Sequence, residues 1–454
     1  MANPFKAFMN IKKEELPLSL LMFSYFFLVI TSFWILKPLK KTLFITFYDQ
    51  TGVDILFWHL RGSQAELIAK VLNMFVAFAA VVVFTLLTRK YHRQQLTFIF
   101  SGFIILAYVI YGFLLESPGD LTIWTFYLFG DLFSTLMVAT FFAFMNDSVT
   151  PEAAKRLYGL VGLGGVLGGV IGTTFVRVWV DSVTPRTWLM ITLVIALVIM
   201  IIAKYAGKLV DKNPPQRLEE KPQSAEIEEK TVNPAFEGAK LVFNSKYLLA
   251  IAGIVGLYEI VSTIMDFQFT STIEHYLDGP AIGRQFSIIF NITNIVGMFV
   301  QLFLTSFIMT RFGLKTALMF LPLAIIIGSA GFIMFPVLWI GSLLNTADNG
   351  FSYSINQSAK ETLYVPTTRD EKYKAKAFID MFVQRFAKAI AVLLSLSITM
   401  IFTDYSSVKW LSVATLIVVI IWIFIVRFVG KEFNKLSDTN LNASTAQLQQ
   451  DHKR

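Results

Sequence analysis

The stretch Leu36-Lys37-Pro38-Leu39-Lys40-Lys41-Thr42-Leu43 closes the first long apolar segment, and apolar residues resume directly after it. One helix from Leu18 to Tyr48 would overshoot a bilayer, which about 20 residues can cross. Pro38 lacks an N–H and biases Lys37 away from helical dihedral angles, so we expect the helix to break there. A cation at bilayer depth costs roughly 2.5–3.5 kcal/mol and usually faces a water-filled cavity or a partner. The three lysines therefore either face a cavity or snorkel to the far interface.

The composition is that of a membrane protein. Hydrophobic residues make up 55% of the 454 residues and charged residues only 15%, which is far more apolar than a soluble domain. The net charge of +8 comes mainly from short loops that set topology, so we expect a lipid bilayer and not nucleic acid as partner. Cysteine is absent and the four histidines are scattered. We therefore expect neither a metal site nor a cofactor.

The apolar segments predict an all-α membrane protein with twelve transmembrane helices. Each segment is long enough to span as a helix. The predicted spans are residues 18–36, 65–88, 96–115, 121–145, 157–180, 187–206, 247–272, 286–309, 314–334, 337–357, 377–402 and 408–428. Two pseudo-symmetric six-helix halves are typical of major-facilitator carriers.

A polar stretch after the sixth span divides the chain. We predict an N-terminal half over residues 1–206, a cytoplasmic linker over 207–246 and a C-terminal half over 247–430. The polar tail over 431–454 is expected, from Ser437 onward, to be disordered or to lie on the surface.

Short matching motifs support a duplication of the two halves. Thr88-Arg89 after the second span recurs as Thr310-Arg311 after the eighth. Glu152-x-x-Lys155 after the fourth span recurs as Glu371-x-x-Lys374 after the tenth. Both offsets are about 220 residues, as expected for a repeated unit.

Glycines gather in the fifth span. A nucleotide-binding loop is not indicated, because the run lies in a membrane segment and lacks the lysine of a P-loop. Small residues three and four apart let two helices approach closely, which is our interpretation of this run. The glycines are Gly159, Gly162, Gly164, Gly165, Gly168, Gly169 and Gly172.

Loop charges predict the orientation. Arg89-Lys90 and Lys155-Arg156 follow the second and fourth spans, whereas the connections Glu116–Asp120 and Phe335–Pro336 are nearly free of Lys and Arg. By the positive-inside rule both termini are cytoplasmic, and we expect a multi-pass protein of a bacterial cytoplasmic membrane. The three lysines of the first segment then lie in the outer half, against the rule, which favours a cavity over snorkelling.

Further ionisable residues lie within the predicted spans. Glu66 and Lys70 are four residues apart and are expected to pair on one helix face. Asp131 and Asp266, one in each half, have no local partner, so each needs a cation from elsewhere or a proton. An ion pair that only fixes helix packing stays open as an alternative. The remaining ones are Arg177, Glu259, Asp348, Arg385 and Lys388, with Lys360 at the inner end of the tenth span.

Several motifs occur together in the order found in one transporter family. Lys37-Pro38-Leu39-Lys40-Lys41-Thr42-Leu43 is similar to its basic motif at the end of the first span. Asp131-Leu132-Phe133, followed by Phe142-Ala143-Phe144-Met145-Asn146, is similar to its motif in the fourth, and Ala359-Lys360-Glu361-Thr362-Leu363-Tyr364-Val365-Pro366 to one at the tenth. The chain thereby resembles the ATP/ADP antiporters of energy-parasitic bacteria and plastids. That family usually has glutamate where Asp131 and Asp266 stand here.

The resemblance implies a major-facilitator fold and exchange of nucleotides across the membrane by alternating access. A nucleotide carries several negative charges, so its carrier needs cations in the cavity, and carboxylates can hold these cations when the site is empty. We expect an anionic small-molecule substrate, a nucleotide, and a monomeric protein. The expected substrate-binding residues are Lys37, Lys40, Lys41, Asp131, Asn146, Asp266, Lys360, Arg385 and Lys388.

Two other functions stay open at this point. A proton-coupled carrier of another organic anion, such as a polycarboxylate or a siderophore, would use Asp131 or Asp266 as its proton site. An integral-membrane transferase is disfavoured, because the sequence shows no compact His/Asp/Glu cluster at a membrane face and repeated halves are typical of carriers. We therefore expect a carrier and not an enzyme.

Overall fold

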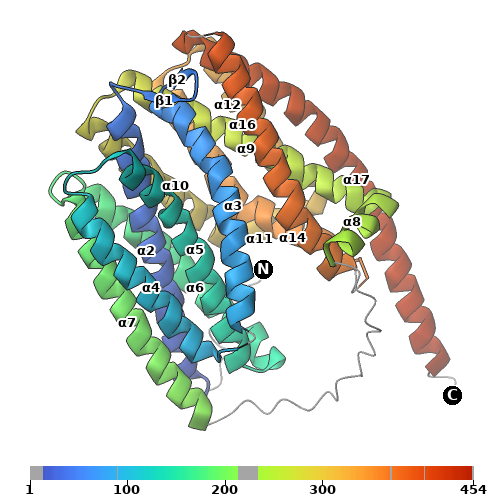
Figure 1. The fold of residues 1–454 in the computed structure, drawn as a ribbon. Helices are drawn as coiled ribbons and strands as arrows, with labels where there is room; N and C mark the ends of the chain where they lie inside the picture. The colour runs from blue at the N-terminus through green and yellow to red at the C-terminus, as the bar shows by residue number, and fades with distance from the viewer. Residues whose placement is uncertain (1–13, 89, 213–233, 369–370, 403, 452–454) are drawn as a thin grey trace. The chain divides into compact units, whose positions relative to one another are not determined.

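The computed structural model describes residues 14–88, 90–212, 234–368, 371–402 and 404–451 (Figure 1). Contacts between Cα atoms divide the chain into two compact units. Unit 1 comprises residues 1–225 and 276–298, and unit 2 comprises residues 226–275 and 299–454.

Unit 1 consists of long helices joined by short connections. The helices are α2 (Leu16–Tyr48), α3 (Gly62–Thr88), α4 (Arg93–Leu114), α5 (Asp120–Ser148), α6 (Pro151–Trp179), α7 (Pro185–Lys212) and, up to residue 298, α10 (Pro280–Phe299). Helix α2 packs against α3, α5, α6 and α7, and α4 packs against α5 and α7 (Figure 1). The helix α2 is therefore the element that the other helices of the N-terminal part surround.

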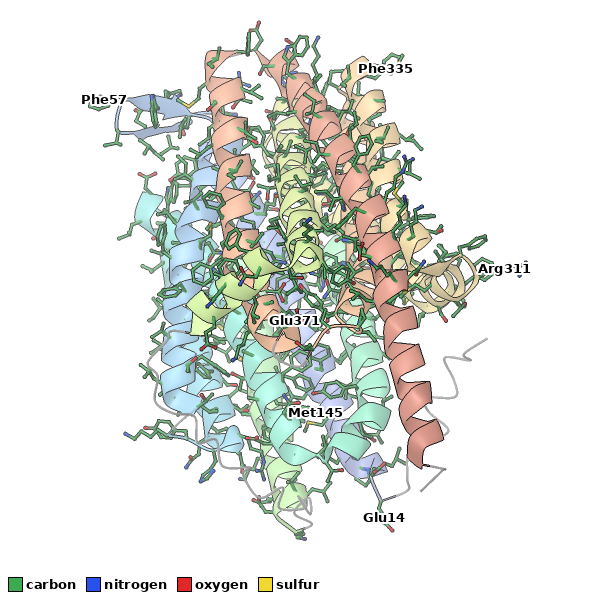
Figure 2. All side chains as sticks on the ribbon, turned by 90° about the vertical axis from the view of Figure 1, so that its right-hand side faces the viewer. Glu14, Phe57, Met145, Arg311, Phe335 and Glu371 are labelled. Atoms are coloured by element: carbon green, nitrogen blue, oxygen red, sulfur yellow. The ribbon has the colours of Figure 1, made fainter. Side chains whose placement is uncertain are left out.

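A small antiparallel hairpin follows α2. Its strands β1 (Val53–Ile55) and β2 (Trp58–Leu60) pair with Val53 opposite Leu60. Leu56 has a φ of 57°, in the left-handed region, and Phe57 is 97% exposed at the tip of the hairpin (Figure 2). Sequence reasoning did not predict this hairpin, because its strands are only three residues long.

Unit 2 is also helical, but several of its helices are interrupted. Its α-helices are α8 (Pro234–Asn244), α9 (Lys246–Tyr276, up to residue 275), α11 (Thr305–Arg311), α12 (Gly313–Met334), α13 (Leu338–Phe351), α14 (Gln357–Leu363), α15 (Lys376–Phe378), α16 (Gln384–Ile401) and α17 (Val408–Asp451). Four π-helical segments join them, namely η1 (Val300–Leu304), η2 (Ser352–Asn356), η3 (Glu371–Ala375) and η4 (Ile379–Val383), and a 3₁₀ turn, η5 (Tyr405–Ser407), precedes α17.

The helices confirm the all-α membrane fold but not the number twelve. Within the described residues, eleven helices are long and apolar enough to cross a membrane. The predicted span at 337–357 is not one of them. Its residues lie in α13 and η2, and the helical path continues into α14 with buried polar side chains such as Asn345, Asp348 and Asn356. These residues lower the apolar character of the segment.

The expected break at Pro38 is wrong. Helix α2 continues through the proline for 33 residues, from Leu16 to Tyr48. A proline inside a helix costs about 3 kcal/mol, because it removes one hydrogen bond and crowds the preceding turn. Packing on both sides outweighs this cost: Ile35 lies in a buried cluster with Val176 and Trp188, and Phe44 beyond the proline is fully buried.

The glycines of α6 let this helix approach α2 closely, as predicted. A Cβ atom on Gly168 would lie 2.5 Å from the backbone oxygen of Phe27, and one on Gly164 would lie 2.8 Å from that of Phe23. Gly172 faces the backbone of Thr31 in the same way. Glycines four residues apart therefore form the face of α6 that contacts α2.

The linker and the tail have more helix than the sequence suggested. Residues 213–233 of the predicted linker lie outside the described residues, whereas α7 runs to Lys212 and α8 begins at Pro234. Helix α17 continues to Asp451, so the backbone of the predicted tail is helical over most of its length instead of disordered. The boundaries of the two halves stay predictions.

Candidate functional site

Lys40 occupies a buried position in the middle of unit 1. It is 5% exposed and forms an ion pair with Asp131 of α5. The other carboxylate oxygen of Asp131 accepts a hydrogen bond from Asn73 Nδ2 of α3 at 2.6 Å. Lys40 Nζ lies 4.2 Å from the ring centroid of Tyr127, and its side chain crosses Gly130, where a Cβ would collide with it. The alternative that Lys40 snorkels to the far interface is therefore wrong. Its partner is Asp131, which the sequence predicts to need a cation or a proton.

A second ion cluster lies beside the first. Lys41 Nζ is 3.1 Å from Glu66 Oε1, and the Tyr127 hydroxyl donates to the same oxygen at 2.8 Å. The predicted pair of Glu66 and Lys70 is present, with Lys70 Nζ 3.7 Å from Glu66 Oε1. Lys41 is therefore the nearer of the two cations to Glu66. Lys41 and Glu66 are both almost fully buried, which excludes snorkelling for Lys41 as well. Tyr127 contacts Lys40 with its ring and Glu66 with its hydroxyl, and so joins the two clusters.

Three lysines and two carboxylates lie in the two clusters. Lys40 pairs with Asp131, and Lys41 and Lys70 pair with Glu66. In a low-dielectric interior a positive charge strongly favours an anion beside it. Asp131 retains 29% exposure of its side chain, against 6% for Lys40. The carboxylate therefore lies on the more exposed side of the pair.

Lys37 lies among aromatic rings. Its Nζ atom is 4.6 Å from the ring centroid of Trp34, 5.2 Å from that of Phe290 and 5.8 Å from that of Phe33. Such cation–π contacts stabilise a half-buried ammonium group. Arg177, another ionisable residue noted in the sequence, donates to Asn291 of α10 at 3.0 Å.

Unit 2 contains a second charged region, on α9, α13 and α16. Lys388 Nζ pairs with Glu259 Oε1 at 3.1 Å, with side chains 37% and 17% exposed. Asp348 accepts from the Ser262 hydroxyl at 2.7 Å. Glu259, Asp348, Lys388 and Asp266 all act electrostatically on Tyr353, so the structure brings these predicted residues into one neighbourhood.

Two predicted residues of unit 2 lie elsewhere on its helices. Lys360, on α14, acts electrostatically on Asp380, beside the ion pair of Lys376 with Glu361 at 2.5 Å. Arg385 is half-buried in the first turn of α16.

Asn146 is not part of the Lys40 cluster. It lies 15 residues after Asp131 on α5, which is roughly 22 Å along the helix. Its side chain is exposed and accepts a hydrogen bond from Tyr158 at 2.5 Å. A direct contact of one small ligand with both Asn146 and Lys40 is therefore not expected.

The sequence of most of this chain matches one family of membrane transporters. The match is to the TLC ATP/ADP transporter family and covers residues 119–433, more than half of the chain. The chain belongs to this family. It is therefore a membrane transporter that exchanges nucleotides, not an enzyme, as the resemblance implied.

Curated relatives of the transporter extend over nearly its whole length. ADP,ATP carrier protein 1 of Chlamydia muridarum is 23% identical, over 97% of this chain and 92% of that relative. ADP,ATP carrier protein 1, chloroplastic, of Arabidopsis thaliana is 22% identical, over 93% of this chain and 74% of that relative.

Solved transporter structures share its fold. The nucleoside transporter NupG superposes with a TM-score of 0.61 and 12% identity, over 91% of this chain and 99% of that one. A bacterial homologue of the human lysosomal transporter Spinster superposes with a TM-score of 0.57 and 12% identity, over 94% of this chain and 99% of that one. These likenesses confirm the predicted major-facilitator-type fold.

Sequence reasoning missed two residues of the transporter's central cluster. Asn73 and Tyr127 lie within apolar spans and carry no charge, so neither stands out from the sequence. Glu66 was noted but assigned to its local partner Lys70. Only the register between α2, α3 and α5 reveals that it pairs with Lys41. The positive charge at Lys41 was the one signal in the sequence that a further carboxylate was needed.

Proposed function

We propose that the transporter exchanges ATP and ADP across a bacterial cytoplasmic membrane by alternating access, and that Lys40 binds the phosphates. The observation that best supports this proposal is the ion pair of Lys40 with Asp131 inside unit 1. A lysine in this setting is a compact charge that attracts a phosphate oxygen as readily as a carboxylate.

In this proposal, Asp131 takes the place of the nucleotide phosphates beside Lys40 when no nucleotide is bound. Without nucleotide, the carboxylate neutralises Lys40, which otherwise would be a costly buried charge. A phosphate group replaces the carboxylate and takes over the same ammonium group. Asn73, which donates to Asp131, then holds the displaced carboxylate within hydrogen-bonding distance of its amide.

The neighbouring cations supply the remaining compensation that a nucleotide needs. An incoming phosphate chain with three or four negative charges exceeds what one lysine can neutralise. Lys41 and Lys70 lie beside Glu66 in the neighbouring cluster and add positive charge near Lys40. In unit 2, Lys388 and Arg385 are assigned the same role, and Lys360 is assigned to the inner end of the path.

The orientation proposed for the protein follows from its loops. Basic residues gather near the starts of α4 and α6, where Arg93 and Lys155 lie, whereas the connection at Glu116–Asp120 has neither Lys nor Arg. Basic connections remain on the cytoplasmic side, which supports cytoplasmic termini. A single chain supplies both charged regions, which is compatible with a monomer.

Counter-exchange in vesicles tests the proposed function. Purified protein is reconstituted into vesicles that contain ADP or no nucleotide, and uptake of labelled ATP is measured. We expect uptake only into ADP-loaded vesicles, and a large loss with Asp131→Asn. Asp211→Asn serves as the matched control, because its carboxylate pairs with Arg93 and is 67% exposed. Equal uptake into empty vesicles would remove the exchange mechanism and favour a carrier of another kind.

A further inference from the structure

An apolar groove of about 680 Å³ lies in unit 2. Its walls come from α8, α9, α15, η4, α16 and α17, and every lining residue is apolar, as with Phe243, Leu249, Leu257, Phe382, Phe386 and Ile425. Pockets of this size match small organic ligands. The groove contains none of the charged residues assigned to nucleotide exchange, so it serves a different ligand.

Aromatic side chains form one wall of the groove. Phe378, Phe382 and Phe386 are spaced four residues apart across η4. The rings of Phe378 and Phe382 stack with centroids 5.5 Å apart, and Phe243 of α8 meets Phe378 at 6.5 Å. Phe243 is 69% and Phe386 70% exposed, so the wall is open to the surroundings of the protein. For helices that cross a membrane, those surroundings are lipid.

The floor of the groove has the length of one leaflet. On α9 it extends from Leu249 to Ile260, eleven residues along the helix, or roughly 16 Å. This is about half of the roughly 30 Å hydrocarbon core of a bilayer. Gly253 and Gly256 add no side chain to this floor, and a Cβ on Gly256 would lie 3.3 Å from Val383. A linear acyl chain fits such a surface better than a compact ligand does.

Charge at the groove's end selects the headgroup. Lys240 and Lys246 are exposed, and each is three residues along a helix from a lining residue, Phe243 and Leu249 respectively. Helix α8 carries Lys240 on one side and buries Val242 on the other, as helices lying in a membrane interface do. Two ammonium groups where α8 meets α9 complement an anionic headgroup.

We propose that this groove binds an anionic phospholipid, with its acyl chain along α9 and its headgroup at Lys240 and Lys246. The bound lipid packs against α9 and α16 immediately beside Glu259 and Lys388, the ion pair that joins these two helices. The lipid thereby supports the helices that carry the charged region of unit 2.

Lipid binding to the full-length protein in neutral detergent tests the proposal. Dioleoyl phosphatidylglycerol and dioleoyl phosphatidylcholine are added separately, and bound lipid is counted by native mass spectrometry. We expect preferential retention of phosphatidylglycerol. Lys240→Gln combined with Lys246→Gln should weaken its binding about 30-fold, from about 1 kcal/mol per lysine. The control is Lys204→Gln with Lys208→Gln, two exposed lysines of α7, which should leave binding unchanged.

A second pair of variants tests the apolar part. Leu249→Trp fills the groove from a position that is 46% exposed, and should reduce binding of both lipids. Phe386→Ala removes part of the wall without adding bulk, and should also reduce binding of both lipids. Full retention of the phosphatidylglycerol preference by the double lysine variant would overturn the proposal. So would unchanged lipid binding in both groove variants, or a dimer that these variants dissociate, which would make a second copy the occupant.

Discussion

The charged regions of the two units differ in how they hold their ions. In unit 1, Lys40, Lys41 and Glu66 are almost fully buried on regular α-helices. In unit 2, Lys388 is 37% exposed, and it follows the π-helical segment η4 by five residues. All four π-helical segments of the described residues belong to unit 2.

This difference separates a rigid ion site from an adaptable one. A buried ion pair keeps its geometry because the loss of either partner leaves an uncompensated charge. A half-exposed pair is screened by water and contributes little to stability. π-helical turns frequently occur at functional sites, where they widen a helix locally. We therefore expect removal of a charge in unit 1 to destabilise the fold, and removal of a charge in unit 2 mainly to reduce transport.

The largest effect is expected from Lys40→Ala. It should abolish ATP/ADP exchange and destabilise the protein by about 3–5 kcal/mol, because among the described residues Asp131 then keeps only Asn73 as a partner. Combining Lys40→Ala with Asp131→Asn should restore much of the melting temperature but not the exchange. Lys388→Ala should reduce exchange with a stability loss of about 1 kcal/mol or less. Similar losses of melting temperature for Lys40→Ala and Lys388→Ala would break the comparison.

The carboxylates give the next largest contrast. Glu66→Gln leaves Lys41 and Lys70 facing a neutral amide in a site that is 1% exposed, so we expect a loss of about 3 kcal/mol. Glu259→Gln makes the same chemical change at 17% exposure and should cost far less. Thermal unfolding of the two variants in the same detergent measures the difference. A larger loss for Glu259→Gln would place the rigid site in unit 2.

Helix packing provides a contrast without charges. In Gly168→Ala the new methyl group would lie 2.5 Å from the backbone oxygen of Phe27, so α2 and α6 must separate, at about 1–3 kcal/mol. In Gly253→Ala of unit 2 the nearest atom is the flexible end of Ile425 at 3.2 Å, which can move aside. Chemical unfolding should therefore distinguish the two. Gly162→Ala, with open space around its Cβ, is the control that should leave stability unchanged.

The smallest expected effect is that of salt on nucleotide affinity. Exposed charges are screened within about 8 Å at physiological ionic strength, whereas buried pairs are screened much less. Lys388 is 37% exposed and Lys40 only 6%, so Lys388 should carry most of the salt dependence. Calorimetric titration at several salt concentrations should show a flatter dependence in Lys388→Gln than in Lys40→Arg. An unchanged slope in Lys388→Gln would move the screened charge to another residue.

Sequence alone predicted the charges of the site better than their partners. Lys40 and Asp131 stand out because an ion inside an apolar segment needs a partner, and the two do pair. Asn73 and Tyr127 complete the cluster but look like ordinary residues of a span. Which residues face one another across two helices depends on rotation and register, which one chain's pattern of apolar residues does not determine.

The fold was predictable to the same degree. Apolar length predicted nearly all of the helices, since every bilayer-spanning segment must satisfy its own backbone hydrogen bonds. It failed where a local rule competes with packing, as at Pro38, and where polar residues interrupt a span, as at Asp348. The hairpin around Phe57 has too few residues to show an alternating pattern.

The proline inside α2 gives this helix a mechanical joint. Pro38 has no N–H, so the carbonyl of Trp34 one turn earlier lacks its usual helical donor, and bending there has one hydrogen bond fewer to distort. The segment before the joint is gripped by the glycine face of α6, around Gly168. The segment after it carries Lys40 and is fastened to α5 through Asp131. A change of ligand at Lys40 therefore acts on the part of α2 after Pro38, while packing against α6 holds the part before it.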